Sequence, residues 1–250
     1  MKKLLLYLFL TKNITSFKCN TNLVMSIHSH SSKELPRLYN AKTDGQKKYK
    51  SSLYSPFFDL IICNGPAGSG KTSIACDYSI HELKNKKYDK IIITRPTVSI
   101  QENLGYLPGT INEKMYPWTL PIFDIFHEYY NKNEVENMIK EGIIEISPLG
   151  FIQGRTFKNA VIVADEMQNS TDEQMYLLLT RLGIGSKMIV NGDLNQNLNK
   201  NGLHDLIYKL ERNYLDINDM HEDRINLIKL EKQDIIRHKI VSKIIDLYKR

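Results

Sequence analysis

The stretch Gly65-Pro66-Ala67-Gly68-Ser69-Gly70-Lys71-Thr72 decides the fold of this 250-residue chain. It matches the phosphate-binding pattern G-x-x-x-x-G-K-S/T, and it lies between an apolar run, 57–63, and a segment of helical periodicity, 73–83. A strand before the glycines and a helix after them is the context in which this pattern binds phosphate. A glycine-rich turn that matches by chance is the alternative, and both flanking elements argue against it.

Each part of this loop has a physical role. The glycines let the backbone wrap closely, with positive φ where needed, so that several N–H groups point at one anion. The helix that follows presents its unpaired N–H groups and its positive dipole end to the same phosphates. Lys71 adds a charge for the β- and γ-phosphates, and the hydroxyl of Thr72 can ligate magnesium. We expect the bound phosphates to contact Gly65, Pro66, Ala67, Gly68, Ser69, Gly70, Lys71, Thr72 and Ser73.

Two adjacent carboxylates end another apolar run, 160–164. Asp165 is placed to hold magnesium through water, as the partner of Thr72. Glu166 can orient and polarise a water molecule that attacks the γ-phosphate. A strand end with solvated acids is the alternative, and the phosphate loop upstream makes it the weaker one.

The motif Gly192-Asp193-Leu194-Asn195-Gln196 follows a further apolar run. Gln196 could contact the γ-phosphate or its attacking water and report hydrolysis to the rest of the domain. A turn rich in Asp and Asn explains the local pattern equally well. The order of the three motifs along the chain favours the functional interpretation.

Alternating apolar strands and helices with short connections predict an α/β fold, a mostly parallel sheet covered by helices on both faces. In such sheets ligands lie at the carboxyl ends of strands. Gly65, Arg95, Asp165, Glu166 and Asp193 all lie at such ends. We expect strands over 57–64, 90–96, 143–146, 160–164, 187–191 and 224–230, helices over 43–53, 72–83, 118–131, 134–141, 171–181, 202–211 and 233–249, and a loop with at most a short helix over 101–117.

The net charge of +6 is unevenly distributed. Residues 1–50 carry ten Lys or Arg against two acidic residues, whereas the remaining 24 basic and 26 acidic residues nearly balance. Nucleic-acid affinity of the main body would therefore need a local groove. The three cysteines form no disulfide framework, and no zinc-ligand spacing occurs. These features predict a reducing compartment, and we expect a cytoplasmic protein.

The first ten residues combine a basic start with a short apolar run. The run is too short to span a bilayer, and no cleavage site of small residues follows it closely. Three interpretations remain open: a mistaken start codon, with Met25 as the true start, a disordered tail, or a weak targeting segment. We favour the first two. We expect residues 1–42 to form a disordered basic extension, residues 43–250 to form the folded domain, and no membrane segment.

Taken together, the motifs resemble those of the PhoH-like ATPases, in the same order and over roughly residues 43–250. This similarity implies a three-layer P-loop ATPase domain like the first RecA-like half of superfamily 1 helicases, in a family associated with RNA. The sequence departs from the family pattern at Ser69, at 152–153 and at Asn197. The segments that carry the resemblance are 65–72, 94–96, 104–109, 154–157, 165–169, 179–183, 192–196 and 234–238.

The resemblance also implies roles for individual residues. Gln46 and Tyr49 match the positions that contact adenine in the family, and a Gln amide can read a donor and an acceptor on one base edge. No Asn-Lys-x-Asp guanine motif occurs in a suitable place, so we expect ATP with Mg2+. In two-lobed helicases the second lobe supplies an arginine to the transferring phosphoryl group. We expect the 57 residues after Asp193 to be too few for such a lobe.

We therefore expect that arginine to come from this domain or from a neighbouring subunit. Arg181 and Arg237 are the first candidates and Arg155 the third, although each could be an ordinary surface arginine. This expectation predicts a ring-like homo-oligomer, such as a hexamer, with ATP between subunits.

The segment 101–118 contains Tyr106, Lys114, Tyr116 and Trp118, which could stack on and bind single-stranded RNA or DNA. Aromatic residues in such a loop serve equally often in packing or in an interface. The leading hypothesis is an ATP hydrolase coupled to single-stranded nucleic acid, such as a helicase-like remodeller. The alternatives are an ATPase that acts on a protein partner and a nucleotide-dependent assembly switch, against which Glu166 argues.

Overall fold

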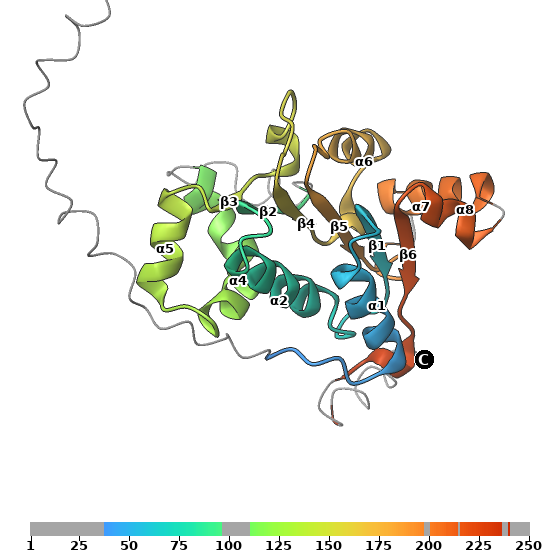
Figure 1. Ribbon diagram of the computed structural model, residues 1–250, viewed down its shortest axis with the longest axis horizontal. Helices are drawn as coiled ribbons and strands as arrows, with labels where there is room; N and C mark the ends of the chain where they lie inside the picture. The colour runs from blue at the N-terminus through green and yellow to red at the C-terminus, as the bar shows by residue number, and fades with distance from the viewer. Residues whose placement is uncertain (1–37, 97–110, 198–200, 215, 237–239, 241–250) are drawn as a thin grey trace, which may run out of the picture. The chain divides into compact units, whose positions relative to one another are not determined.

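The computed structural model describes residues 38–96, 111–197, 201–214, 216–236 and 240, with the backbone alone over 111–118. The described chain forms a six-stranded sheet in the order β3-β2-β4-β5-β1-β6, and every neighbouring pair is parallel. The predicted α/β class is confirmed (Figure 1). The strands are β1 (Leu60–Asn64), β2 (Lys90–Thr94), β3 (Ile144–Ile146), β4 (Ala160–Ala164), β5 (Lys187–Gly192) and β6 (Ile225–Lys229).

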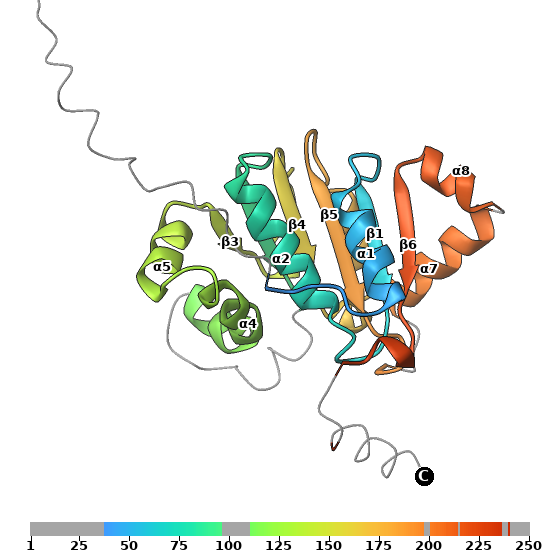
Figure 2. The same ribbon diagram turned by 60° about the horizontal axis from the view of Figure 1, so that its bottom comes forward.

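Helices cover both faces of this sheet. Helices α1 and α2 lie against one face, and α6 and α7 pack on the other (Figures 1 and 2). Helix α4 packs against α2 beside the sheet. The helices are α1 (Asp44–Tyr54), α2 (Lys71–Lys84), α4 (Ile111–His127), α5 (Lys132–Lys140), α6 (Asp172–Leu179), α7 (Gly202–Asn213) and α8 (Ile217–Glu222), and the 3-10 turns are η2 (Leu149–Phe151), η3 (Met167–Asn169) and η4 (Lys232–Asp234).

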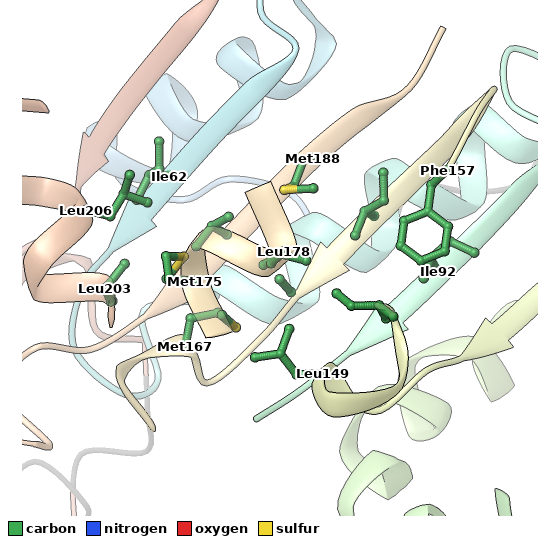
Figure 3. Packing of buried hydrophobic residues seen from close by; sticks show 14 of the residues in the cluster. Ile62, Ile92, Leu149, Phe157, Met167, Met175, Leu178, Met188, Leu203 and Leu206 are labelled. Atoms are coloured by element: carbon green, nitrogen blue, oxygen red, sulfur yellow. The ribbon is translucent and has the colours of Figure 1, made fainter. Parts of the chain in front are cut away.

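The alternation of side chains along each strand divides the core into two clusters. Ile61 and Cys63 of β1 pack with Tyr49 of α1 and Tyr78 of α2, while Ile62 between them points to the opposite cluster. That second cluster contains Met175 and Leu178 of α6 with Leu203 and Leu206 of α7 (Figure 3). Every residue of β4 is buried, as expected for a central parallel strand covered on both faces.

Helix α4 differs from the expectation for its segment. It begins at Ile111, whereas we expected a loop up to Pro117 and a helix from Trp118. We expect that loop because of Gly105, Pro108 and Gly109, which lie outside the described residues. The helix also contains Pro117, and a proline removes one backbone donor and clashes with the preceding turn. Burial of Ile122, Phe123 and Phe126 stabilises this helix and outweighs that cost.

Other boundaries also shift. Strand β1 begins at Leu60 rather than Phe57, and α8, which begins after the N-cap Asp216, was not predicted. The expected closing helix over 233–249 lies mostly outside the described residues. Residues 38–42 fall in the segment that we expect to be a disordered extension, but they contact the domain: the backbone N–H of Leu38 donates to the hydroxyl of Tyr129. No helix among the described residues is long and apolar enough to cross a bilayer.

The strand order determines where functional groups meet. Strand β5 lies between β1 and β4, so the carboxyl ends of these three strands are neighbours. The loop after β1, the turn after β5 and the carboxylates after β4 therefore meet at one edge of the sheet. This edge is the expected ligand position in an open α/β sheet.

Candidate nucleotide-binding site

A cavity of about 690 Å3 is lined by residues at the carboxyl ends of β1, β5 and β4. Polar groups from separate elements converge on it, as they do in most ligand sites. The predicted site residues that line it are Gln46, Ala67, Gly68, Gly70, Lys71, Thr72, Ser73, Asp165, Glu166, Asp193 and Gln196. The other lining residues are Leu38, Tyr39, Asn40, Lys42, Ile74, Gly192 and Ile236.

The glycine loop has the backbone that its sequence requires. Gly68 and Gly70 have φ of 82° and 86°, a region that other residues rarely adopt. Gly70 is the N-cap of α2 and makes no side-chain hydrogen bond to the first turn, so the helix N-terminus is open to an anion. Gly65, Pro66 and Ser69 do not line the cavity, and the Ser69 hydroxyl supports the loop by donating to the Pro66 carbonyl at 2.7 Å.

The ammonium group of Lys71 lies within the loop. Its Nζ donates to the backbone carbonyls of Gly65 at 2.5 Å and Pro66 at 3.0 Å. The residue is 9% exposed and lines the cavity. These carbonyls hold the charge close to the place where a phosphate chain would lie, and a phosphate would be the stronger, charge-assisted acceptor.

Opposite the loop, Asp165 contacts two partners. Its Oδ1 accepts a hydrogen bond from the Thr72 hydroxyl at 2.9 Å, and its Oδ2 lies 2.5 Å from Nη2 of Arg95. The carboxylate is buried. A hydroxyl and a carboxylate that meet at the end of a phosphate loop are the hard oxygen donors that Mg2+ prefers, so the donor set fits this ion.

Glu166 is held in an unusual backbone conformation. Its φ and ψ are 58° and 35°, in the left-handed region that residues other than glycine seldom occupy. Such conformations concentrate at functional sites. The Oε2 atom accepts from the Gln168 amide at 2.6 Å, and the residue lines the cavity.

Asp193 connects the turn after β5 to the phosphate loop. Its Oδ2 accepts from the backbone N–H of Ala67 and from Nε2 of Gln196, each at 3.1 Å. The structure therefore brings the third predicted motif to the cavity, where Gln196 is part of the lining.

Of the two residues expected to contact adenine, Gln46 lines the cavity and Tyr49 does not. Tyr49 is fully buried and does not line the cavity, because its hydroxyl donates to Oδ1 of Asn191 inside the core. Burial raises the pKa of its hydroxyl well above the usual value. Gln46 lines the cavity, but its Nε2 donates to the carbonyls of Ser69 and Asp234, and its Oε1 accepts from Lys42 N–H. Its amide therefore joins the phosphate loop to the chain at Lys42 and at Asp234.

The candidate arginines within the described residues lie away from the cavity lining. Arg181 donates to the carbonyls of Leu177 and Arg155. Arg155 pairs with Glu145, which raises the pKa of the Arg155 guanidinium, and stacks over the ring of Phe157 at 4.8 Å. Arg237 lies outside the described residues, as do the side chains of the predicted aromatic loop.

Three contributors were missed as site residues. The sequence places Arg95 at a strand end, and its position in Thr94-Arg95-Pro96 after an apolar run is a usable signal for a site residue. Gln168 lies in the segment 165–169 that carries the family resemblance, but its sequence context gives it no role. Ile236 lines the cavity, and its backbone N–H donates to the Gly68 carbonyl at 3.1 Å, a contact that no local pattern predicts.

The profile of a family described as "PhoH-like protein" matches residues 39–249. A "PhoH-like protein" of Bacillus subtilis is 41% identical over 83% of this chain and 63% of its own length. "Protein PhoH" of Escherichia coli is 33% identical over 83% of this chain and 57% of its own length. The chain thus spans about six tenths of these relatives.

Similarity to solved structures is more distant. The large terminase of a thermophilic bacteriophage in complex with ADP has a TM-score of 0.43 and 14% identity, over 82% of this chain and 49% of that one. The Pif1 helicase of Candida albicans has a TM-score of 0.40 and 15% identity, over 84% of this chain and 43% of that one.

Proposed function

The chain belongs to the PhoH-like protein family, and from this premise we propose that it binds Mg-ATP in the described cavity and hydrolyses it. Family membership and the parallel α/β fold support a nucleotide-dependent activity. The absence of an Asn-Lys-x-Asp motif in a suitable place favours adenine over guanine. Hydrolysis is supported by the two carboxylates that face the phosphate loop.

One observation carries this proposal. The Thr72 hydroxyl at the start of α2 donates to Asp165 after β4 at 2.9 Å, across 93 residues of sequence. This contact joins the phosphate loop to the carboxylate pair, so Lys71 and Glu166 line one cavity. A phosphate chain bound by the loop would lie between a cation and a water-activating carboxylate, the arrangement that phosphoryl transfer to water needs.

Each residue would then have one task. The loop N–H groups and Lys71 bind the β- and γ-phosphates and compensate their charge. Thr72 and Asp165 would hold Mg2+, which neutralises phosphate charge when bound. The Oε2 atom of Glu166 is held by Gln168, so we assign Oε1 to orient the attacking water and to receive its proton.

We further propose that hydrolysis is coupled to single-stranded RNA or DNA. The resemblance of the motifs to a family associated with RNA supports this coupling. Arg155 and Arg181 are engaged inside the domain, so a neighbouring subunit or Arg237 is the better source of an additional arginine. A homo-oligomer with ATP between subunits would supply it.

The test is ATP turnover by the full chain, with and without single-stranded RNA and single-stranded DNA. We expect turnover that polynucleotide stimulates and that Lys71→Ala abolishes together with ATP binding. Turnover without any response to polynucleotide would favour a protein substrate. ATP binding without measurable turnover would favour an assembly switch, and unchanged ATP affinity in Lys71→Ala would contradict the proposed site.

A further inference from the structure

Gln168 lies two residues after Glu166, in the short turn η3 at the end of β4. Its side chain is almost completely buried, with 1% of the residue exposed. Burying an amide is costly unless its donors and acceptor are paired, because it gives up its hydrogen bonds with water. The partners of this amide therefore indicate what the position requires.

All of these partners are residues of the proposed site. The Nε2 atom donates to Oε2 of Glu166 at 2.6 Å and to Oε1 of Gln196 at 3.2 Å. The Oε1 atom accepts from the backbone N–H of Asp193 at 3.1 Å. One side chain thus joins the carboxylate after β4 to the turn after β5.

Only a glutamine can make this set of contacts. An amide offers two donor hydrogens on one atom and an acceptor on the other, and both hydrogens of Gln168 have a partner. A glutamate would retain the acceptor for Asp193 N–H but would place a second carboxylate against Glu166. Leucine, of similar size, would leave both partners in the turn after β5 without their bonds.

The backbone around the amide is adapted to it. A Cβ atom at position 192 would lie 2.4 Å from Cδ2 of Leu203 and 2.9 Å from Oε1 of Gln168, so a side chain there would displace the amide as well as the leucine. Glu166 adopts the left-handed conformation at φ 58°, which is unfavourable for a residue with a Cβ. The short hydrogen bond from Gln168 helps to hold the Glu166 side chain in that arrangement.

The same contacts extend to the phosphate loop. Asp193, whose N–H is bound by Gln168, accepts from Ala67 N–H in the loop and from the Gln196 amide. A phosphate would compete with Asp193 for loop N–H groups, because both are anionic acceptors. Occupation of the loop therefore acts on a turn that is bonded to Gln168, and through it on Glu166.

We propose that Gln168 is a positioning residue for hydrolysis, which fixes the Glu166 carboxylate and couples it to the Asp193–Gln196 turn. Gln168 does not line the cavity, so it acts through these neighbours and contacts no phosphate. The inference rests on the proposed function, because it gives Glu166 the task of orienting water.

The test compares Gln168→Leu, Gln168→Glu and Glu166→Gln in the full chain. We expect Gln168→Leu to lower ATP turnover by roughly 10- to 100-fold, the scale of a misplaced catalytic group, with ATP affinity nearly unchanged. Combining Gln168→Leu with Glu166→Gln should cost little more than Glu166→Gln alone, since the two side chains act as a unit.

Hydrogen exchange separates loss of the bond to the Asp193 N–H from loss of turnover, which a merely structural role would not do. The Asp193 amide should exchange faster in Gln168→Leu and stay protected in Gln168→Glu, which retains the acceptor but should lose turnover. Ser170→Ala is the matched control, because this buried hydroxyl of the same turn donates to the Met167 carbonyl at 2.7 Å, and its turnover should match wild type.

The outcomes distinguish the two proposals. Full turnover in Glu166→Gln would remove the proposed function itself. Loss of turnover in Glu166→Gln with wild-type turnover in Gln168→Leu would overturn the positioning role alone. So would a double variant whose fold-loss of turnover equals the product of the two single losses. Should Gln168→Leu fail to fold, wild-type turnover in Gln168→Glu would overturn the proposal.

Discussion

Arg95 and Asp165 form an ion pair at the carboxyl ends of the neighbouring strands β2 and β4, with Nη2 and Oδ2 2.5 Å apart. The other oxygen of Asp165 accepts from Thr72, the second proposed magnesium ligand. Side-chain exposure is 14% for Arg95 and 2% for Asp165, so the pair is shielded from water. The arginine therefore supplies positive charge to the carboxylate that we assign to the metal.

Replacing this arginine should make the folded protein depend on magnesium. Arg95→Gln leaves a buried carboxylate without its cation, which we expect to lower the free energy of unfolding by about 3 kcal/mol in metal-free buffer. Mg2+ bound at Asp165 would replace the missing charge, so Mg2+ should stabilise this variant more than wild type. Urea unfolding with and without Mg2+ measures both quantities.

Arg155→Gln is the matched control, because Arg155 also pairs with a carboxylate, that of Glu145, but away from the cavity lining. Its response to Mg2+ should equal that of wild type. Equal Mg2+ responses in Arg95→Gln and wild type would contradict the assignment of Asp165 to the metal.

Gln46 should affect nucleotide affinity without selecting the base. Its amide joins the Ser69 carbonyl of the phosphate loop to Asp234 and Lys42. Gln46→Ala should therefore loosen the loop and weaken ATP and GTP binding by a similar factor, about 5- to 10-fold, as expected for the loss of one or two hydrogen bonds. Titration calorimetry with both nucleotides tests this; a loss confined to ATP would show that the amide contacts adenine instead.

Tyr49 should contribute to stability and not to binding. Tyr49→Phe removes the hydroxyl that donates to Asn191 at 2.8 Å and leaves that buried acceptor unpaired, which should cost about 1–2 kcal/mol of unfolding free energy. ATP affinity should stay unchanged. Tyr176→Phe, at a side chain that is largely exposed, should change neither quantity. Reduced ATP affinity with wild-type stability in Tyr49→Phe would contradict the structural role.

Lys187 should give the stability a characteristic pH dependence. Burial lowers the pKa of Lys187 from 10.5 to about 8, while its Nζ donates to the carbonyls of Leu53 and Ser55 near the end of α1. At pH values between the folded-state pKa and the unfolded pKa of Lys187, the unfolded chain binds more protons than the folded protein does. The free energy of unfolding contributed by this lysine therefore rises with pH across the window.

Urea unfolding of wild type and Lys187→Met at pH 7.5 and pH 9.5 isolates the effect. The stability of wild type relative to the variant should increase by about 1–2 kcal/mol over this interval, from the linkage relation. A difference that is constant or that shrinks would show that the lysine keeps its proton in the folded protein.

The parts of the candidate site whose position in the fold sequence anticipated depend on local spacing. The eight residues from Gly65 to Thr72 carry their own geometry, because the positive φ at Gly68 and Gly70 needs only the glycines. The apolar runs identified the six strands, and placing Asp165 and Asp193 at strand ends was sufficient to bring them to one edge.

The parts that sequence did not predict depend on how distant segments pack. Tyr49 lies in the core because α1 packs against β1 and β6, and its hydroxyl donates to Asn191 of β5, 142 residues away. The side-chain amide of Gln46 donates to the backbone carbonyl of Asp234, 188 residues away. No periodicity within either segment specifies these pairings, so a motif match could give the residue types but not their partners.

The most direct test of the central claim is ATP hydrolysis by Glu166→Gln, with ATP affinity measured on the same preparation. If Glu166 orients the attacking water beside a phosphate chain bound by Lys71, affinity should stay within about twofold while turnover falls by roughly 100-fold or more, the usual contribution of a general base. Turnover close to that of wild type would contradict the account.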